Sequence, residues 1–222
     1  MGFFMERTSF TNAENKNFYR NLPLGKMNSW IEASGLTQTP DLDLIWENIS
    51  SVPEILELGA AEGRVVEGLL SREYKGTIYA VERDEIRCDF LRKRFEDNKN
   101  VRVLQKDILK DKLPNSHTGL WLLAGIVEFN SSEQRNVLQK LSDLISDQLI
   151  LDIPAEGSKS NATFSLGNYI EIDTGWATIK GHIPSRDEIR RYLDGTNFHL
   201  GRIIPYKTSS NRVRELYLLD IK

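Results

Sequence analysis

The chain has little cysteine and no long apolar run, and both absences narrow its possible functions. Cys88 is the single cysteine among 222 residues, so an internal disulfide framework and a cysteine-built zinc site are excluded and a reducing compartment is favoured. No stretch approaches the roughly 18 consecutive apolar residues of a membrane-spanning helix. The first residues also lack the apolar core of a signal peptide. We therefore expect a cytoplasmic protein that does not cross a membrane.

The chain also lacks a strong charge of one sign. Its formal net charge is −3, which argues against a protein that holds DNA or RNA by phosphate neutralisation alone. Basic residues at 92–94 and at 186, 190 and 191 leave a local basic face open, and with it a protein or RNA partner. A content of 40% hydrophobic and 27% charged residues is typical of a globular protein, and the length favours one domain.

Short apolar runs alternate with amphipathic helical patterns through residue 154. The runs cover 54–58, 77–81, 101–104, 119–124 and 148–154, and helical spacing of apolar residues fills the intervals after most of them. Two further alternating runs, at about 199–206 and 213–221, indicate a terminal antiparallel pair. This order predicts an α/β fold, doubly wound around a mostly parallel sheet.

Two finer predictions concern the helices. Ser131 with Gln134 has the spacing of a capping box, as does Ser185 with Glu188. In the helix predicted over 84–97, Ile86, Phe90, Leu91 and Phe95 should form the inner side.

Three acidic residues stand at or near the ends of the first three predicted strands: Glu57, Glu82 and Asp107. Ligands of doubly wound sheets bind outside the carboxyl ends of the strands. A single strand-end acid is often only a helix cap, and a glycine pair after a strand is often only a tight turn. Their joint occurrence in regular order favours a ligand site.

The loop after the first strand reads Gly59-Ala60-Ala61-Glu62-Gly63. The dinucleotide fingerprint Gly-x-Gly-x-x-Gly would place a second glycine where Ala61 stands. Glu62 also adds a negative charge near the helix N-terminus, where a pyrophosphate would bind. An NAD-dependent oxidoreductase is therefore an alternative that the loop composition disfavours.

The segment from Glu57 to Gly63 instead resembles motif I of the class I S-adenosylmethionine-dependent methyltransferases, (Asp or Glu)-x-Gly-x-x-x-Gly. The resemblance extends over about residues 50–154, and the two terminal strands fit the family's sixth and seventh strands. It implies a Rossmann-like methyltransferase fold with a seven-stranded sheet. It also implies S-adenosylmethionine as cofactor, with S-adenosylhomocysteine as product.

The resemblance assigns roles to individual residues. Glu57 matches the acid that interacts with the cofactor's methionine amino group, and Glu82 matches the acid that binds both ribose hydroxyls. Asp107 matches the side-chain contact to the adenine amine, with Ile108 supplying the neighbouring amide. The implied cofactor-binding set is Glu57, Gly59, Ala60, Ala61, Gly63, Glu82, Asp107, Ile108 and Ala124.

The implied reaction transfers a methyl group to an oxygen or nitrogen nucleophile of a small molecule by in-line displacement. The fourth strand is not followed by the Asp- or Asn-Pro-Pro-aromatic motif of enzymes that methylate DNA or RNA bases. It also lacks an acidic pair that would hold magnesium, so no metal is expected. No residue is assigned as a general base, and the oligomeric state stays open.

Domain boundaries and acceptor-side residues are expectations of the same kind. Residues 1–38 are expected to form an N-terminal cap or lid, and 39–222 the cofactor-binding domain with 155–184 as an acceptor-side insertion. The candidate acceptor residues are Tyr19, Glu128, Tyr169 and His182. For Glu128 a plain loop acid, and for His182 a solvated loop histidine, are the simpler interpretations. A non-catalytic cofactor-binding or interaction module on the same fold is a further alternative.

Overall fold

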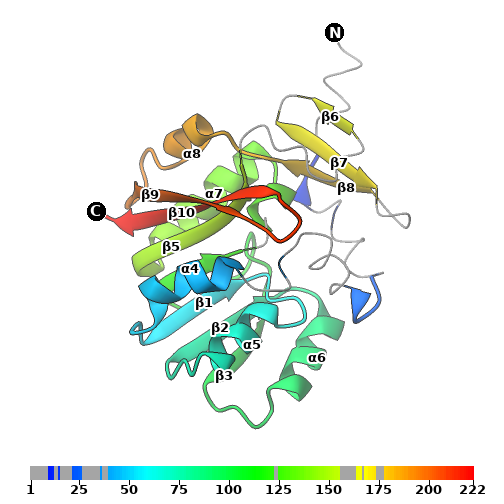
Figure 1. Ribbon diagram of the computed structural model, residues 1–222, viewed down its shortest axis with the longest axis vertical. Helices are drawn as coiled ribbons and strands as arrows, with labels where there is room; N and C mark the ends of the chain where they lie inside the picture. The colour runs from blue at the N-terminus through cyan, green and yellow to red at the C-terminus, as the bar shows by residue number, and fades with distance from the viewer. Residues whose placement is uncertain are drawn as a thin grey trace.

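The computed structural model describes residues 10–12, 15, 22–26, 36, 40–122, 125–155, 164–166, 168–173 and 178–222 (Figure 1). Most of the expected N-terminal cap, with Tyr19, lies outside these residues, as does Ala124. None of the helices within the described ranges is long and apolar enough to span a membrane.

A seven-stranded sheet forms the centre of the molecule, in the order β3-β2-β1-β4-β5-β10-β9. Strands β1 to β5 are parallel, and β10 runs antiparallel between β5 and β9. The expected fold class, including the terminal antiparallel pair, is confirmed. The strands are β1 (Glu54–Leu58), β2 (Thr77–Glu82), β3 (Val101–Gln105), β4 (Ser116–Trp121), β5 (Ile145–Pro154), β9 (Phe198–Lys207) and β10 (Val213–Ile221).

Helices pack on both faces of this sheet because successive strand residues point to opposite faces. Ile55 belongs to one apolar core, with side chains of α4 (Pro40–Ile49), α5 (Arg64–Ser71) and α6 (Glu85–Arg94). Its neighbour Leu56 belongs to the second core, with side chains of the 3₁₀ helix η1 (Gly125–Glu128), α7 (Ser131–Ser142) and α8 (Arg186–Tyr192). The crossover between β3 and β4 contains no helix over residues 106–115.

The expected insertion at 155–184 contains a second, antiparallel sheet of β6 (Phe164–Leu166), β7 (Tyr169–Asp173) and β8 (Thr178–His182). Asn15 ties this sheet to η1, because its Nδ2 donates to the carbonyls of Lys180 (2.7 Å) and Glu128 (3.0 Å).

Two helix details differ from the predictions. The capping box of α7 is formed by Asn130 and Glu133, not Ser131 and Gln134: Asn130 Oδ1 accepts from the Glu133 amide (3.0 Å), and the Glu133 carboxylate accepts from the Asn130 amide (3.1 Å). The box begins one residue earlier than predicted, because Asn130 and Glu133 also have the spacing of a capping box. Glu133 accepts from the Asn12 amide as well (2.9 Å). The box at Ser185 and Glu188 is confirmed.

The inner face of α6 agrees with the prediction at Leu91 and differs from it at the start of the helix. Ile86 is 55% exposed, while Arg87, Cys88 and Leu91 are the buried residues. The Arg87 guanidinium turns inward because its Nη2 donates to the carbonyl of Leu22 at 2.9 Å. The N-terminal segment thus covers a charge that periodicity alone would place in solvent.

Candidate functional site

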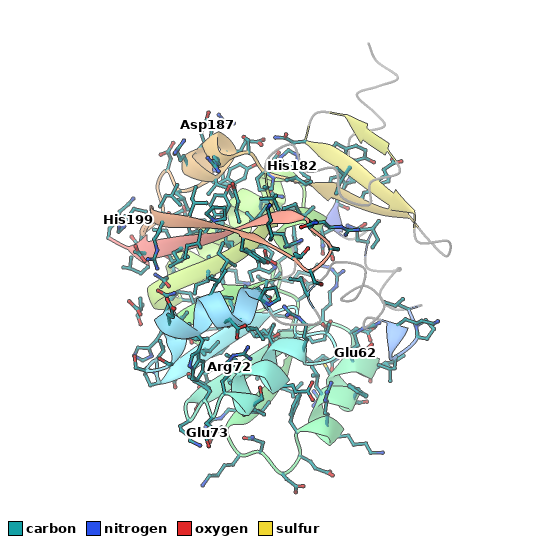
Figure 2. The ribbon with its side chains drawn as sticks, in the orientation of Figure 1. Glu62, Arg72, Glu73, His182, Asp187 and His199 are labelled. Carbon is teal, nitrogen blue, oxygen red and sulfur yellow. The ribbon has the colours of Figure 1, made fainter. Side chains whose placement is uncertain are left out.

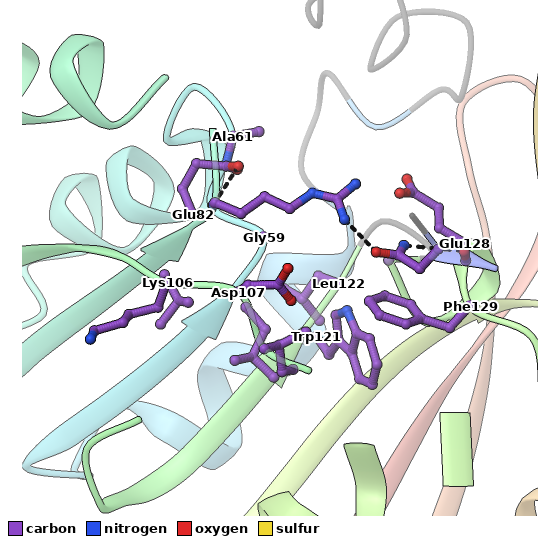
Figure 3. A pocket seen from close by; sticks show the side chains of 15 residues that line it. Gly59, Ala61, Glu82, Lys106, Asp107, Trp121, Leu122, Glu128 and Phe129 are labelled. Atoms are coloured by element: carbon purple, nitrogen blue, oxygen red, sulfur yellow. Dashed lines mark hydrogen bonds between the residues drawn. The ribbon is translucent and has the colours of Figure 1, made fainter. Parts of the chain in front are cut away.

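A pocket opens at the carboxyl ends of β1 to β4 (Figure 3). The strand order reverses there, because β2 and β3 lie on one side of β1 and β4 and β5 on the other. This is the position at which doubly wound sheets bind ligands. The lining residues are Asn12, Leu58, Gly59, Ala61, Val81, Glu82, Arg83, Lys106, Asp107, Ile108, Trp121, Leu122, Gly125, Glu128 and Phe129.

The glycine loop forms one wall of the pocket. Gly59 has a φ of +74° and a side chain added there would meet no atom within 4 Å, so the backbone faces open space. The amides of Gly59 and Ala60 both donate to the Val81 carbonyl at 2.9 Å, which holds the loop against β2. Ala61 also has a positive φ, 49°, a conformation that is uncommon for residues other than glycine. Gly59 and Ala61 line the pocket, whereas Ala60 is buried and Gly63 precedes α5.

Glu82 is fixed at the end of β2 by three backbone amides. Its Oε2 accepts from Ala61 (2.9 Å), and its Oε1 accepts from Arg83 (2.7 Å) and Asp84 (2.9 Å). Only 8% of the residue is exposed, yet it lines the pocket. Ionised carboxylate oxygens accept several hydrogen bonds, so this one can accept from further donors in the pocket without leaving its place.

Asp107 and Ile108 line the pocket from the loop after β3. The Asp107 amide donates to Asp111 Oδ2 (2.7 Å), and Asp107 Oδ1 accepts from the Leu109 amide (3.0 Å). In Figure 3 the Asp107 carboxylate points into the pocket. The third strand-end acid therefore reaches the site as the sequence pattern predicts.

Glu57 lies deeper, directly before the pocket-lining residues Leu58 and Gly59. It is 3% exposed, and its Oε2 has no hydrogen-bond partner among the residues that the structure describes. Burial raises the pKa of this carboxyl to about 8; Arg64 opposes the shift and Glu82 adds to it. Arg64 itself is paired with buried Asp41, at 3.0 and 2.5 Å. Glu57 thus keeps one oxygen without a hydrogen-bond donor among the described residues, and a ligand could supply that donor.

Glu62 does not extend its charge into the pocket. Both of its carboxylate oxygens accept from the Gly25 amide, at 3.0 and 3.1 Å, and it is absent from the pocket lining. Its function is to hold residues 22–26 against the glycine loop. Glu62 would therefore not repel a pyrophosphate in the pocket. Ala61 is then the feature of the loop that departs from the dinucleotide fingerprint.

The structure adds pocket residues that sequence reasoning missed. Trp121 and Phe129 form an edge-to-face pair with ring centroids 5.2 Å apart. The Arg83 guanidinium donates to Asn12 Oδ1, and both residues line the pocket. Arg83 directly follows Glu82, and Phe129 directly follows Glu128, so their neighbours in the sequence could have indicated a place in the pocket. Asn12 lies in a stretch without any motif, and nothing in the sequence indicated its place there.

The candidate acceptor residues are not all at the pocket. Glu128 lines it. Tyr169 packs against Phe10, with centroids 5.8 Å apart, and donates to Glu171 at 2.5 Å. His182, at the end of β8 (Figure 2), has Nε2 3.1 Å from Glu188 Oε1. Neither Tyr169 nor His182 lines the pocket, and within the described part of the chain no cluster of His, Cys, Asp and Glu is arranged to hold a metal.

Comparison with known proteins adds structural relatives but no sequence relatives. No protein-family model and no curated protein matches the sequence. An S-adenosylmethionine-dependent methyltransferase from Clostridium acetobutylicum ATCC 824 superposes with a TM-score of 0.67 at 13% identity, covering 89% of this chain and 99% of that one. Magnesium protoporphyrin IX methyltransferase (ChlM) from Synechocystis PCC 6803, solved with S-adenosylhomocysteine, superposes with a TM-score of 0.68 at 12% identity. The match covers 95% of this chain and 99% of that one.

The glycopeptide N-methyltransferase MtfA, also solved with S-adenosylhomocysteine, gives a TM-score of 0.67 at 16% identity, covering 84% of this chain and 90% of that one. The fold is that of the class I methyltransferases. The resemblance read from motif I is therefore confirmed at the level of the fold.

Proposed function

We propose that the protein binds S-adenosylmethionine and transfers its methyl group to an oxygen or nitrogen nucleophile of a small molecule. The observation that carries the proposal is a set of three carboxyls beside a glycine loop at the switch point of a methyltransferase fold. Glu82 and Asp107 line the pocket, and Glu57 is buried directly before the lining residue Leu58. The structural relatives solved with S-adenosylmethionine or its product support the choice of cofactor.

The residues present fit that cofactor. The orphaned Oε2 of Glu57 suits the α-amino group of the methionine part, and the fixed carboxylate of Glu82 suits two ribose hydroxyls. Asp107 accepts from the adenine amine, and the open space beside Gly59 lets the ligand approach the backbone. When bound, the cofactor supplies an electrophilic methyl group on a positively charged sulfur. Carboxylates around it stabilise this charge, and burial strengthens the effect.

The opposite wall is the proposed acceptor side. Trp121 and Phe129 present apolar surface that excludes water, and Glu128 provides a polar group beside them. Positioning the nucleophile in line with the methyl group is the main contribution to rate that such a site makes. No residue is assigned as a general base.

The acceptor class is inferred from the pocket. Asn12 lines the pocket and bonds to Arg83 and to the Glu128 carbonyl, so residues of the N-terminal segment share the proposed acceptor side, which supports a small molecule as acceptor. The N-terminal segment, with Tyr19, is proposed as a cap on the acceptor side. Tyr169 and His182 are proposed to support the insertion at 155–184, to which they belong. ChlM and MtfA are named for a porphyrin and a glycopeptide, so the fold accommodates acceptors of very different shape.

Calorimetric titration of the protein with S-adenosylmethionine, S-adenosylhomocysteine and NAD tests the cofactor. Saturable binding of the first two, with none of NAD, is the expected result. Binding of NAD alone would overturn the proposal in favour of an oxidoreductase, and binding of none by the folded protein would favour an interaction module. Methyl transfer from labelled cofactor into metabolite, protein and RNA fractions then distinguishes the acceptor classes.

A further inference from the structure

The loop that presents Asp107 and Ile108 is held from a distant element. It follows β3 directly, and no helix intervenes before β4. On its β2 side, the Lys106 amide donates to the Glu82 carbonyl at 2.9 Å. Where Asp107 and Ile108 line the pocket, the loop receives a further support from outside itself.

Lys140, in the last turn of α7, provides that support. Its Nζ donates to the Ile108 carbonyl at 2.7 Å and also to the Asp111 carbonyl. Both carbonyls lie outside its own helix, so this lysine does more than balance the helix dipole. Partial burial lowers the pKa of Lys140, while Asp111 and Asp107 oppose the shift, so the ammonium lies within the field of both carboxylates.

The carbonyls of Ile108 and Asp111 lie in the same turn as the hydrogen bonds that orient Asp107. Asp111 Oδ2 accepts from the Asp107 amide (2.7 Å), the Asp111 amide donates to the Asp107 carbonyl (2.8 Å), and Asp107 Oδ1 accepts from Leu109 (3.0 Å). Fixing Ile108 and Asp111 therefore fixes the direction of the Asp107 carboxylate. Without Lys140, two partly buried carbonyls lose their donor and the turn can reorient.

We infer that Lys140 is a positioning residue for recognition of the purine 6-amino group: through Ile108 and Asp111 it aims the Asp107 carboxylate at that amine. This inference rests on the proposed function, because it takes adenine as the base beside Asp107. A carboxylate held in place accepts from a 6-amino group and repels a 6-oxo group. One that is free to turn distinguishes the two poorly.

The test is the ratio of dissociation constants for S-adenosylhomocysteine and its 6-oxo analogue, S-inosylhomocysteine, in the parent and in Lys140→Met. We expect the parent to prefer the amino form by about tenfold or more, the value of one hydrogen bond to a charged group. In Lys140→Met the ratio should fall toward one, mainly through weaker binding of the amino form. Lys112→Met, which alters an exposed lysine of the same crossover, should keep the parent ratio.

A second variant guards against unfolding of α7. Asp111→Asn weakens the acceptor of the Asp107 amide from within the loop and should lower the same ratio. An unchanged ratio in both folded variants, or an equal loss for both ligands, would overturn the positioning role and leave the proposed function standing. Failure of the parent to bind either nucleoside would instead overturn the proposed function, and the inference with it.

Discussion

At the scale of single residues, Glu57 is the most unusual group in the site. Nothing among the described residues donates to its Oε2, and its pKa is raised to about 8 because burial disfavours the charged form. Such a carboxyl costs stability whenever it ionises. A cation beside it would lower the pKa again. A buried, incompletely bonded acid is expected where a ligand completes the site.

The raised pKa predicts how stability depends on pH. Between 4.5, the ordinary value for glutamate, and about 8, native Glu57 keeps a proton that the unfolded chain has lost. The free energy of unfolding should therefore fall by about 1.4 kcal/mol per pH unit in this window. The contribution of Glu57 to stability is fully present below pH 4.5 and is lost as the pH rises through about 8. Glu57→Gln should remove this slope in urea unfolding, whereas exposed Glu96→Gln should keep it; equal slopes in all three proteins would contradict the assignment.

Glu82 gives a second prediction at this scale. Glu82→Ala should weaken binding of S-adenosylhomocysteine by about 1–3 kcal/mol, because it removes a charged acceptor for two hydroxyls. Glu82 also accepts three backbone amides, so Glu82→Gln, which keeps the shape, separates loss of charge from loosening of the loop. Calorimetry should show weaker binding for both variants and parent-like binding for Glu85→Ala, an exposed neighbour on α6. Parent affinity in a folded Glu82→Ala protein would remove the ribose role.

Among the helices and strands, apolar periodicity and glycine positions predicted those elements that local sequence determines. The strand, glycine loop and helix at residues 54–71 follow from an apolar run, two glycines and helical spacing. The cap of α7 was misplaced by one residue, where two overlapping capping patterns compete in the sequence. The inner face of α6 was predicted correctly at Leu91 and wrongly at Ile86, and buried Arg87 on that helix bonds to Leu22 of the N-terminal segment. Contacts between residues more than 60 positions apart leave no periodic signal.

The glycine loop should not tolerate a side chain at Gly59 if it faces a bound cofactor. Gly59→Val should abolish binding of S-adenosylhomocysteine, because the new side chain enters the open space of the pocket wall. Positive φ also strains any substituted residue, and Gly195→Val controls for that strain. Gly195 has a φ of +81° and likewise meets nothing within 4 Å, but it lies outside the pocket lining. If both valine variants bind like the parent in calorimetry, the loop is only a turn.

At the scale of the whole molecule, the sequence allowed prediction of the sheet, its switch point and the three acids, since alternating strands and helices restrict the topology severely. The presence of Asn12 and Trp121 in the pocket was not predictable, because these residues come together only in the folded chain. The same applies to the buried ion pair that joins the terminal hairpin to the parallel strands. Arg214 on β10 donates to both oxygens of Asp152 on β5, at 2.8 to 3.2 Å, and Tyr206 on β9 donates to Asp152 at 2.9 Å.

Asp152→Asn should therefore lower the free energy of unfolding by about 3–5 kcal/mol, because it leaves the Arg214 guanidinium buried without its counter-charge. Asp152 is fully buried, and Arg214 has a side chain only 10% exposed. The matched change Asp147→Asn, at an exposed position of the same strand, should alter stability by no more than about 0.5 kcal/mol. Urea unfolding of the three proteins gives the comparison. Equal midpoints would mean that strand pairing between β5 and β10 and apolar packing hold the hairpin without the ion pair. A larger loss for Asp152→Asn would mean that the ion pair strengthens the attachment of the antiparallel edge to the parallel strands.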